Sequence, residues 1–229
     1  DATRVAVGCG SVSLCQQLVA ITCREPGDEV VYAWRSFESY PIVTQVQGAT
    51  KRIVPLDAEF RHDLEAMAAA VTPRTRLVFV CTPNNPTGTA VRRDEFERFL
   101  HAVGPDVLVA LDEAYREFVT DPDAVDGTAL LDAHPNLVVL RTFSKAYRLA
   151  GLRVGYALGA PQVAQALRKV GSPFAVSAIA QAAALAALDC RAELLAGCAE
   201  VEGERERVRG ERRRRGEPCH GAPPGTEAR

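Results

Sequence analysis

The alternation of short apolar runs with helix-like segments constrains the fold of this chain more than any other feature. We predict strands near residues 4–7, 29–33, 51–54, 77–81, 107–111, 137–142 and 154–158. Segments with helical periodicity lie between and after them, near residues 12–23, 37–46, 64–71, 93–102, 162–170 and 178–188. Strands that are apolar along their whole length are covered on both faces. The pattern therefore predicts an α/β fold, a three-layer αβα arrangement around a mostly parallel sheet.

The composition is that of an ordinary globular protein. Hydrophobic residues make up 47% and charged residues 24% of the 229 positions, enough for one large domain or two small ones. The formal net charge of -2 gives no reason to expect nucleic acid or an acidic membrane as a partner. The sequence also contains no apolar run of membrane-spanning length.

The seven cysteines are scattered without C-x-x-C spacing, and Cys15 and Cys81 lie within apolar patterns. This usage favours reduced thiols in a cytoplasmic protein over a disulfide framework or a zinc site, and we expect no metal. The chain opens with Asp1 rather than Met, almost directly on the first predicted strand, so we expect that the amino end is missing.

The composition changes near Val201. Between residues 202 and 229 there are eight Arg and six Glu, and Val208 is the only large apolar residue. Such a segment cannot bury a core, so we predict that residues 202–229 are a disordered or out-of-frame tail. We expect one large domain over residues 1–190, followed by the start of a linker helix at residues 191–201.

A glycine-rich turn, Gly8-Cys9-Gly10-Ser11, joins the first predicted strand to the first predicted helix. Glycines allow backbone N–H groups to approach an anion closely, Ser11 can cap the helix, and the helix dipole favours a phosphate. A simple tight turn explains this motif alone equally well.

A second motif, Cys81-Thr82-Pro83-Asn84-Asn85-Pro86-Thr87-Gly88, follows the predicted strand at residues 77–81. Its prolines and asparagines predict a rigid loop at the carboxyl end of a strand, where open α/β sheets bind ligands. An Asn amide in such a loop can donate a hydrogen bond to a phenolate oxygen. A turn without a ligand is the alternative.

A third motif, Ala110-Leu111-Asp112-Glu113-Ala114-Tyr115, ends the next apolar strand. The carboxylate of Asp112 can pair with a protonated ring nitrogen, and the hydroxyl of Tyr115 can reach another polar edge of the same ring. An N-cap aspartate followed by a core tyrosine is the structural alternative.

The fourth motif combines Ser144-Lys145-Ala146 with Ala150-Gly151-Leu152-Arg153-Val154-Gly155. Only three of the 27 basic residues are lysines, and Lys145 is one of them. A lysine can lose its proton and attack an aldehyde, which arginine cannot do. The hydroxyls of Thr142 and Ser144 and the guanidinium of Arg153 would suit a phosphate on the same ligand.

Together and in this order, the motifs resemble those of the fold-type-I pyridoxal-phosphate aminotransferases, in the histidinol-phosphate aminotransferase branch. The resemblance extends from about residue 4 to residue 190. Within that branch, the strings G-C-G-S-V at residues 8–12 and V-Y-A-W-R-S-F-E at residues 31–38 look most similar to the actinobacterial aromatic (phenylalanine) aminotransferases.

The resemblance implies a role for each matching residue. Lys145 would hold pyridoxal 5'-phosphate covalently and then move a proton on the substrate, and Asp112 would keep the pyridine nitrogen protonated. Asn85 and Tyr115 would bind the ring hydroxyl, and Phe37, where relatives commonly carry Tyr, would stack on the ring. The implied phosphate site comprises Gly10, Ser11, Val12, Thr142, Ser144 and Arg153.

The implied reaction is transfer of an amino group between an aromatic amino acid and 2-oxoglutarate by a homodimeric enzyme. Histidinol phosphate is the alternative substrate, and a related pyridoxal-phosphate decarboxylase or a non-catalytic remnant is a further alternative. Relatives carry an amino-terminal lid and a carboxy-terminal small domain whose Arg binds the substrate carboxylate. We find neither here, so the resemblance implies a partial chain with the small domain largely missing.

Overall fold

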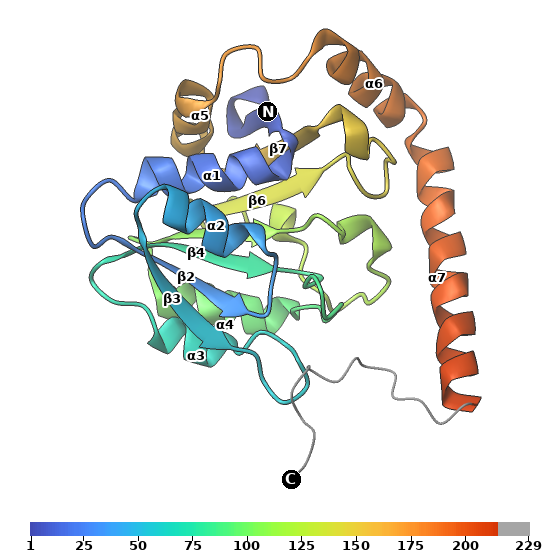
Figure 1. Ribbon diagram of the computed structural model, residues 1–229, viewed down its shortest axis with the longest axis horizontal. Helices are drawn as coiled ribbons and strands as arrows, with labels where there is room; N and C mark the ends of the chain where they lie inside the picture. Colours follow the sequence, from blue (N-terminus) through green and yellow to red (C-terminus); the bar gives the residue numbers. More distant parts are fainter. Residues whose placement is uncertain (215–229) are drawn as a thin grey trace.

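A seven-stranded sheet forms the centre of the computed structural model, which describes residues 1–214 (Figure 1). The strands are β1 Val5–Cys9, β2 Glu29–Trp34, β3 Thr50–Pro55, β4 Thr75–Cys81, β5 Leu108–Asp112, β6 Leu137–Thr142 and β7 Val154–Leu158. They lie in the order β1-β7-β6-β5-β4-β2-β3. All seven predicted strands are present, close to their predicted bounds.

One strand reverses direction. β2 pairs in parallel with β3 and β4, and β5 pairs in parallel with β4 and β6. β7 instead pairs antiparallel with both β6 and β1. The predicted α/β fold with a mostly parallel sheet is confirmed, and β7 makes that sheet mixed. As a consequence, β7 begins at the edge of the sheet where the other six strands end.

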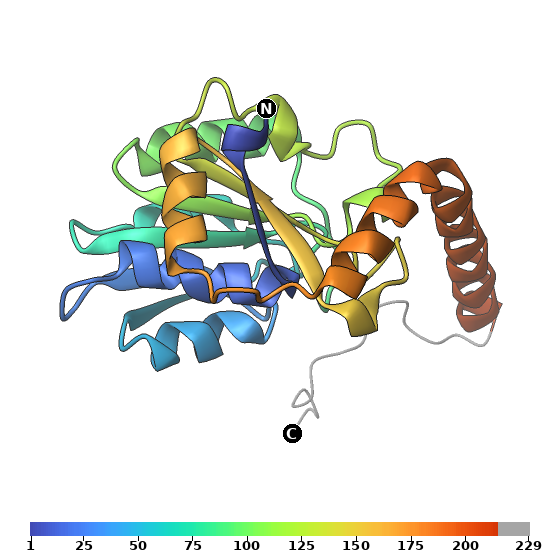
Figure 2. The ribbon, with the colours of Figure 1, turned by 90° about the horizontal axis from the view of Figure 1, so that it is seen from above.

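Helices cover both faces of the sheet, which gives the three layers (Figures 1 and 2). α1 Gly10–Thr22, α2 Ser39–Val46 and α5 Pro161–Val170 pack on one face. α3 Leu64–Ala69 and α4 Arg93–Val103 pack on the other. Four short 3-10 helices lie at Ala2–Arg4, Arg116–Phe118, Gly127–Ala129 and Ala150–Leu152.

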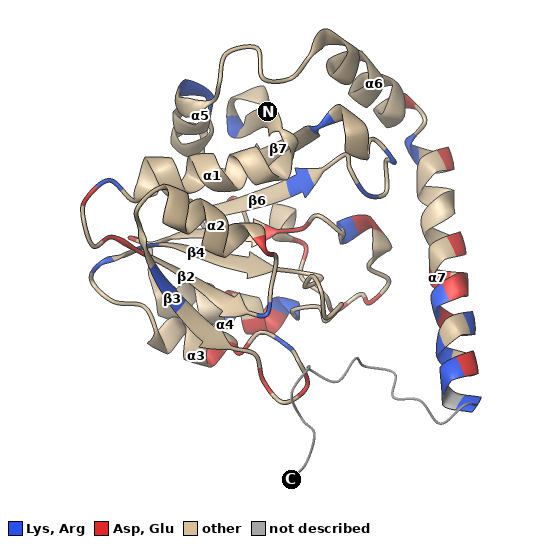
Figure 3. Ribbon diagram, in the orientation of Figure 1, with Lys and Arg blue, Asp and Glu red and all other residues tan. Residues whose placement is uncertain are grey.

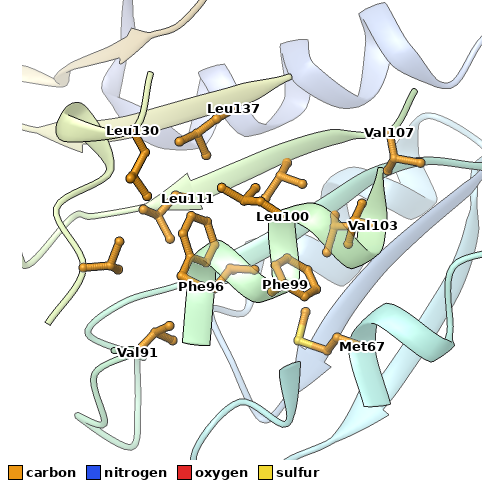
Figure 4. Packing of buried hydrophobic residues seen from close by; sticks show 14 of the residues in the cluster. Met67, Val91, Phe96, Phe99, Leu100, Val103, Val107, Leu111, Leu130 and Leu137 are labelled. Carbon is orange, nitrogen blue, oxygen red and sulfur yellow. The ribbon is translucent and has the colours of Figure 1, made fainter. Parts of the chain in front are cut away.

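The apolar spacing of each helix determines which side faces the sheet. In α4, Phe96, Phe99, Leu100 and Val103 recur at helical spacing, and all four are buried against the sheet (Figure 4). Facing them are strand residues such as Leu111, which is fully buried. Because strand side chains alternate between faces, the neighbouring Ala110 belongs to the core under α1 and α2.

The last two helices differ from the rest. α6 Ala178–Asp189 packs beside β7, and α7 Arg191–Arg214 extends away from the sheet along the 3-10 helix Arg116–Phe118 (Figures 1 and 2). Acidic and basic residues are interspersed along the second half of α7 (Figure 3). The helix begins where a linker helix is predicted and continues through residues 202–214, the first part of the segment for which we predict a disordered or out-of-frame tail. The rest of the predicted tail, residues 215–229, lies outside the described residues.

Ion pairs between neighbouring turns explain why α7 stays helical beyond residue 201. Arg205 pairs with Glu202, Arg207 with Glu204 and Glu211, and Arg209 with Glu206, at spacings of three or four residues. Such pairs stabilise an exposed helix that buries little. Within residues 1–214, none of the helices is long and apolar enough to cross a membrane.

Candidate active site

The chemistry-bearing residues converge at one edge of the sheet. Cys81, Asp112 and Thr142 are the last residues of β4, β5 and β6, which lie side by side. Because β7 is reversed, Arg153, immediately before it, reaches the same edge. α1 also begins there, directly after β1. The sheet topology therefore brings together residues that are far apart in sequence.

A cavity of about 110 Å³ lies at this edge. Ten of the eleven predicted site residues line it: Ser11, Val12, Phe37, Asn85, Asp112, Tyr115, Thr142, Ser144, Lys145 and Arg153. The eleventh, Gly10, lies directly against the Arg153 side chain. Sequence reasoning missed two lining residues, Cys81 and Ala114. Both residues lie inside the second and third sequence motifs, so their position next to predicted site residues could have identified them.

The amino end of α1 packs tightly against the backbone of β7. Gly10 has a φ of 73°, a left-handed conformation that favours glycine, and a Cβ there would overlap the Arg153 guanidinium. A Cβ at Gly155 would overlap the Ser11 backbone nitrogen and lie 2.7 Å from the Gly10 carbonyl carbon. These two glycines let the first N–H groups of α1 and the Arg153 guanidinium share one small space, which suits an anion.

A chain of hydroxyl and guanidinium contacts extends this basic end of the cavity. Arg153 donates from Nη1 to Ser144 Oγ at 3.2 Å and to the Ala150 carbonyl oxygen at 2.9 Å. Thr142 Oγ1 donates to Ser144 Oγ at 3.0 Å. No carboxylate is recorded as a partner of this guanidinium in residues 1–214. Its charge is therefore available to an anionic group.

Asp112 is the buried acid of the cavity, 2% exposed. Its Oδ2 accepts a hydrogen bond from Tyr40 at 2.9 Å, and its Oδ1 accepts one from the Ala114 N–H at 3.2 Å. Burial raises the pKa of Asp112 to about 6, while these two hydrogen bonds and the charge of Lys145 act in the opposite direction. A carboxylate held in this way has a large electrostatic gain from a buried cationic partner.

Lys145 lies in the loop after β6. Its Nζ lies 5.0 Å from the centroid of the Tyr115 ring, a cation–π contact. The side chain is exposed. Lys145, Ser144 and Tyr115 also line an adjoining cavity of about 460 Å³, whose far wall is formed by the α7 residues Cys198, Val201, Glu202 and Arg205. The amine thus lies between two cavities.

The two asparagines of the second motif have different environments. Asn84 is buried, and it accepts from Ser36 at 2.7 Å and donates to the Arg35 carbonyl oxygen at 3.0 Å. Asn85 lines the cavity instead. Asn84 therefore holds the loop in place, and Asn85 is the asparagine that lines the cavity. Phe37 also lines the cavity, from the turn before α2.

The donor set fits pyridoxal 5'-phosphate. The glycine-lined end with Ser144 and Arg153 matches an anionic phosphate, and the buried Asp112 matches a protonated ring nitrogen. Lys145 is an amine that can reach an aldehyde from the rim of the same cavity. The phosphate, the ring nitrogen and the aldehyde of the cofactor therefore each have a chemically matched residue.

A larger cavity, of about 410 Å³, lies between α3 and α4 but has a less suitable lining. Its two arginines, Arg61 and Arg98, are paired with Asp57 and Asp94. Its lining contains no lysine. The chemistry of the lining, rather than the size of the cavity, places the candidate active site at the carboxyl edge of the sheet.

Comparison with known families agrees with this site. A sequence model of the family described as aminotransferase class I and II matches residues 1–217. The chain belongs to the class I and II aminotransferases. This family depends on pyridoxal phosphate, as the motifs implied. The match continues beyond residue 190, where the resemblance was expected to end.

Close relatives of this aminotransferase chain are aromatic amino acid aminotransferases. The protein of that name from Rhodococcus jostii is 62% identical over 205 residues, which are 90% of this chain and 56% of the relative. The one from Streptomyces avermitilis is 60% identical over 206 residues, 90% of this chain and 57% of the relative. The expected similarity to the actinobacterial aromatic aminotransferases is confirmed.

Solved structures show the same fold. The histidinol-phosphate aminotransferase from Sinorhizobium meliloti, in complex with pyridoxal-5'-phosphate, matches with a TM-score of 0.84 and 34% identity over 90% of this chain and 56% of that one. The N-succinyldiaminopimelate aminotransferase from Mycobacterium tuberculosis matches with a TM-score of 0.85 and 26% identity over 96% and 60%. The chain thus spans less than two thirds of the length of these relatives.

Proposed function

We propose that this chain is the cofactor-binding part of an aminotransferase that moves an amino group between an aromatic amino acid, phenylalanine or tyrosine, and 2-oxoglutarate. The observation that carries the proposal is the convergence of Lys145, Asp112 and Arg153 on one cavity. Sequence identity of 58–62% to several aromatic amino acid aminotransferases supports the substrate class.

Each residue of the proposed site has a role that follows from its chemical group. When bound, pyridoxal phosphate supplies an aldehyde and an electron-accepting ring. Lys145 Nζ would hold the aldehyde, and as a free amine it would take the proton from the substrate Cα. Asp112 would stabilise a protonated ring nitrogen, and Asn85 and Tyr115 would hold the ring hydroxyl. The α1 N–H groups of Ser11 and Val12, with Thr142 and Ser144, would anchor the phosphate beside Arg153, and Phe37 would cover the ring face.

Histidinol phosphate is the second candidate substrate. The support is the similarity in fold, at 34% sequence identity, to the histidinol-phosphate aminotransferase from Sinorhizobium meliloti. The aromatic substrate is favoured because the sequence identity to the aromatic amino acid aminotransferases is higher, up to 62%. A decarboxylase would use the same cofactor residues, and release of carbon dioxide from the amino acid would distinguish it. A cytoplasmic location stays a prediction.

We also propose that the enzyme is a homodimer. The support is a groove of about 830 Å³ between β7 and α6, lined largely by apolar side chains. Of its lining residues, Phe174 is fully exposed and Leu185 is 66% exposed. A second copy of the chain would remove this apolar surface from water.

Trapping the cofactor tests the proposed function. The purified chain is mixed with pyridoxal phosphate, its visible absorbance is recorded, and borohydride is added before peptide mapping. We expect a yellow imine and a reduced adduct on Lys145, with the exposed Lys51 and Lys169 unlabelled. Phenylalanine is then expected to bleach the colour faster than histidinol phosphate. An adduct spread over all three lysines would contradict the proposed site, and faster bleaching by histidinol phosphate would contradict the proposed substrate.

A further inference from the structure

Tyr40, which belongs to none of the four sequence motifs, contacts the buried Asp112. Tyr40 lies in the first turn of α2, and its side chain is fully buried. Its hydroxyl donates to Asp112 Oδ2 at 2.9 Å. Its ring stacks on Phe79 of β4, with the centroids 4.5 Å apart and the planes at 8°, and meets Phe37 edge-on at 5.7 Å. The hydroxyl is therefore held in place by packing on both sides.

The groups around Asp112 make this hydrogen bond important. Cys15 of α1 and Cys81 of β4 lie close to the carboxylate, and burial together with the Asp112 charge raises the pKa of both thiols, so they stay neutral. Lys145 provides the only positive charge that acts on Asp112 among the described residues. Of the interactions that oppose the cost of burying the carboxylate, the Tyr40 hydrogen bond is the largest. Burial also raises the pKa of Tyr40, so its hydroxyl keeps the proton that it donates.

We propose that Tyr40 is a positioning residue, whose buried hydroxyl fixes the Asp112 carboxylate in the orientation and the ionised form that a protonated ring nitrogen requires. The proposal rests on the role of Asp112 in the proposed function. Tyr40 does not line the cavity, so it acts through Asp112 rather than on the ligand. With Tyr40 Oη on one carboxylate oxygen and the Ala114 N–H on the other, rotation of the carboxylate is restricted from two directions.

A neighbouring tyrosine provides a matched control. Tyr32 of β2 is also fully buried, and its ring centroid lies 6.2 Å from that of Tyr40. Its hydroxyl has no hydrogen-bond partner among residues 1–214. Tyr40→Phe and Tyr32→Phe therefore remove the same atom from two adjacent buried rings, and only the first removal affects Asp112.

The experiment measures the affinity of the full chain for pyridoxal phosphate as a function of pH, by absorbance, without requiring turnover. In Tyr40→Phe the pKa of Asp112 should rise further, so the pH at which affinity is lost on the acid side should move upward by about one pH unit. The loss of affinity should be greatest near neutral pH and smaller at about pH 9. Tyr32→Phe should leave the curve in place. The cofactor's own ionisations are common to all variants.

Asp112→Asn separates the two proposals. If Asp112 binds the ring nitrogen, this variant should lose affinity and lose the acid-side step that belongs to Asp112. Adding Tyr40→Phe to it should then change nothing, because the two residues act through one carboxylate. An unchanged curve for Tyr40→Phe, with Asp112→Asn altered as expected, would overturn the role of Tyr40. An unchanged curve for Asp112→Asn would instead overturn the proposed role of Asp112.

A merely structural role for Tyr40 also has a distinct outcome. If the hydroxyl only stabilises the fold, Tyr40→Phe would lower the melting temperature but leave the pH midpoint of cofactor binding where it is. If it acts as proposed, the midpoint moves even when the Phe ring, which keeps its stacking on Phe79, preserves the fold.

Discussion

Lys145 combines two properties that a substitution can separate. It carries a positive charge over the Tyr115 ring, and it is an amine able to bond to an aldehyde. Arginine keeps the first property and lacks the second. In Lys145→Arg we expect pyridoxal phosphate to bind reversibly, with no adduct after borohydride. The control is Lys169→Arg, which changes an exposed residue of α5. This variant should still be labelled at Lys145, as the unaltered chain is. Mass spectrometry of the reduced protein distinguishes these outcomes, and a residual adduct in Lys145→Arg would contradict the assignment.

The burial of Asp112 has a cost that varies with pH. Its pKa is about 6 in the folded chain and 3.8 ordinarily, so between these values the folded state holds more protons than the unfolded state. Stability in the absence of cofactor therefore falls as pH rises through this range, and the penalty is complete above it. Asparagine cannot ionise. We expect Asp112→Asn to be more stable than the unaltered chain by about 3 kcal/mol near pH 8, with the difference shrinking toward pH 4. Urea unfolding at both pH values measures it, and an equal difference at both would contradict the cause given.

At the scale of elements, the contact between α1 and β7 determines the shape of the anion site. A Cβ at Gly155 would overlap Ser11, so Gly155→Ala must push the two elements apart. We expect it to destabilise the fold by about 1–3 kcal/mol and to weaken pyridoxal phosphate binding at least tenfold, roughly the effect of overpacking at a rigid site. A Cβ at Gly151 meets open space, so Gly151→Ala is the control and should change neither quantity. Equal effects of the two changes on cofactor binding would show that the close approach is unimportant.

The elements themselves were largely predictable, because periodicity is a local property of the sequence. The apolar run of β4 and the spacing of Phe96 and Phe99 in α4 needed no knowledge of the rest of the fold. The contact of Tyr40 with Asp112 joins residues 72 positions apart and depends on the spatial order of β2, β4 and β5. No local pattern contains that order. The outer part of α7 was missed for a different reason: its Arg–Glu spacing was visible, but composition was given more weight than spacing.

At the scale of the whole molecule, the groove beside β7 leaves apolar surface open to water. Leu185 and Leu188 of α6, which line the groove, are 66% and 47% exposed. We expect the chain to self-associate as concentration rises, and Leu185→Glu combined with Leu188→Glu to shift it toward monomer in analytical ultracentrifugation. Val46→Glu changes an equally exposed residue on α2, outside the groove, and should leave association unchanged. Equal behaviour of all three proteins would contradict a dimer that uses this groove.

The reversed strand also affects the order in which the molecule can assemble. β1, near the start of the chain, has β7 as its one partner in the sheet, and Gly10 reaches its place only when Arg153 and Gly155 are present. During synthesis, β2 to β6 can therefore pair before β7 exists. β1 and α1 cannot take their places until β7 has been synthesised. Closing so long a loop is slow, which makes the contact between α1 and β7 one of the last parts of this sheet to form.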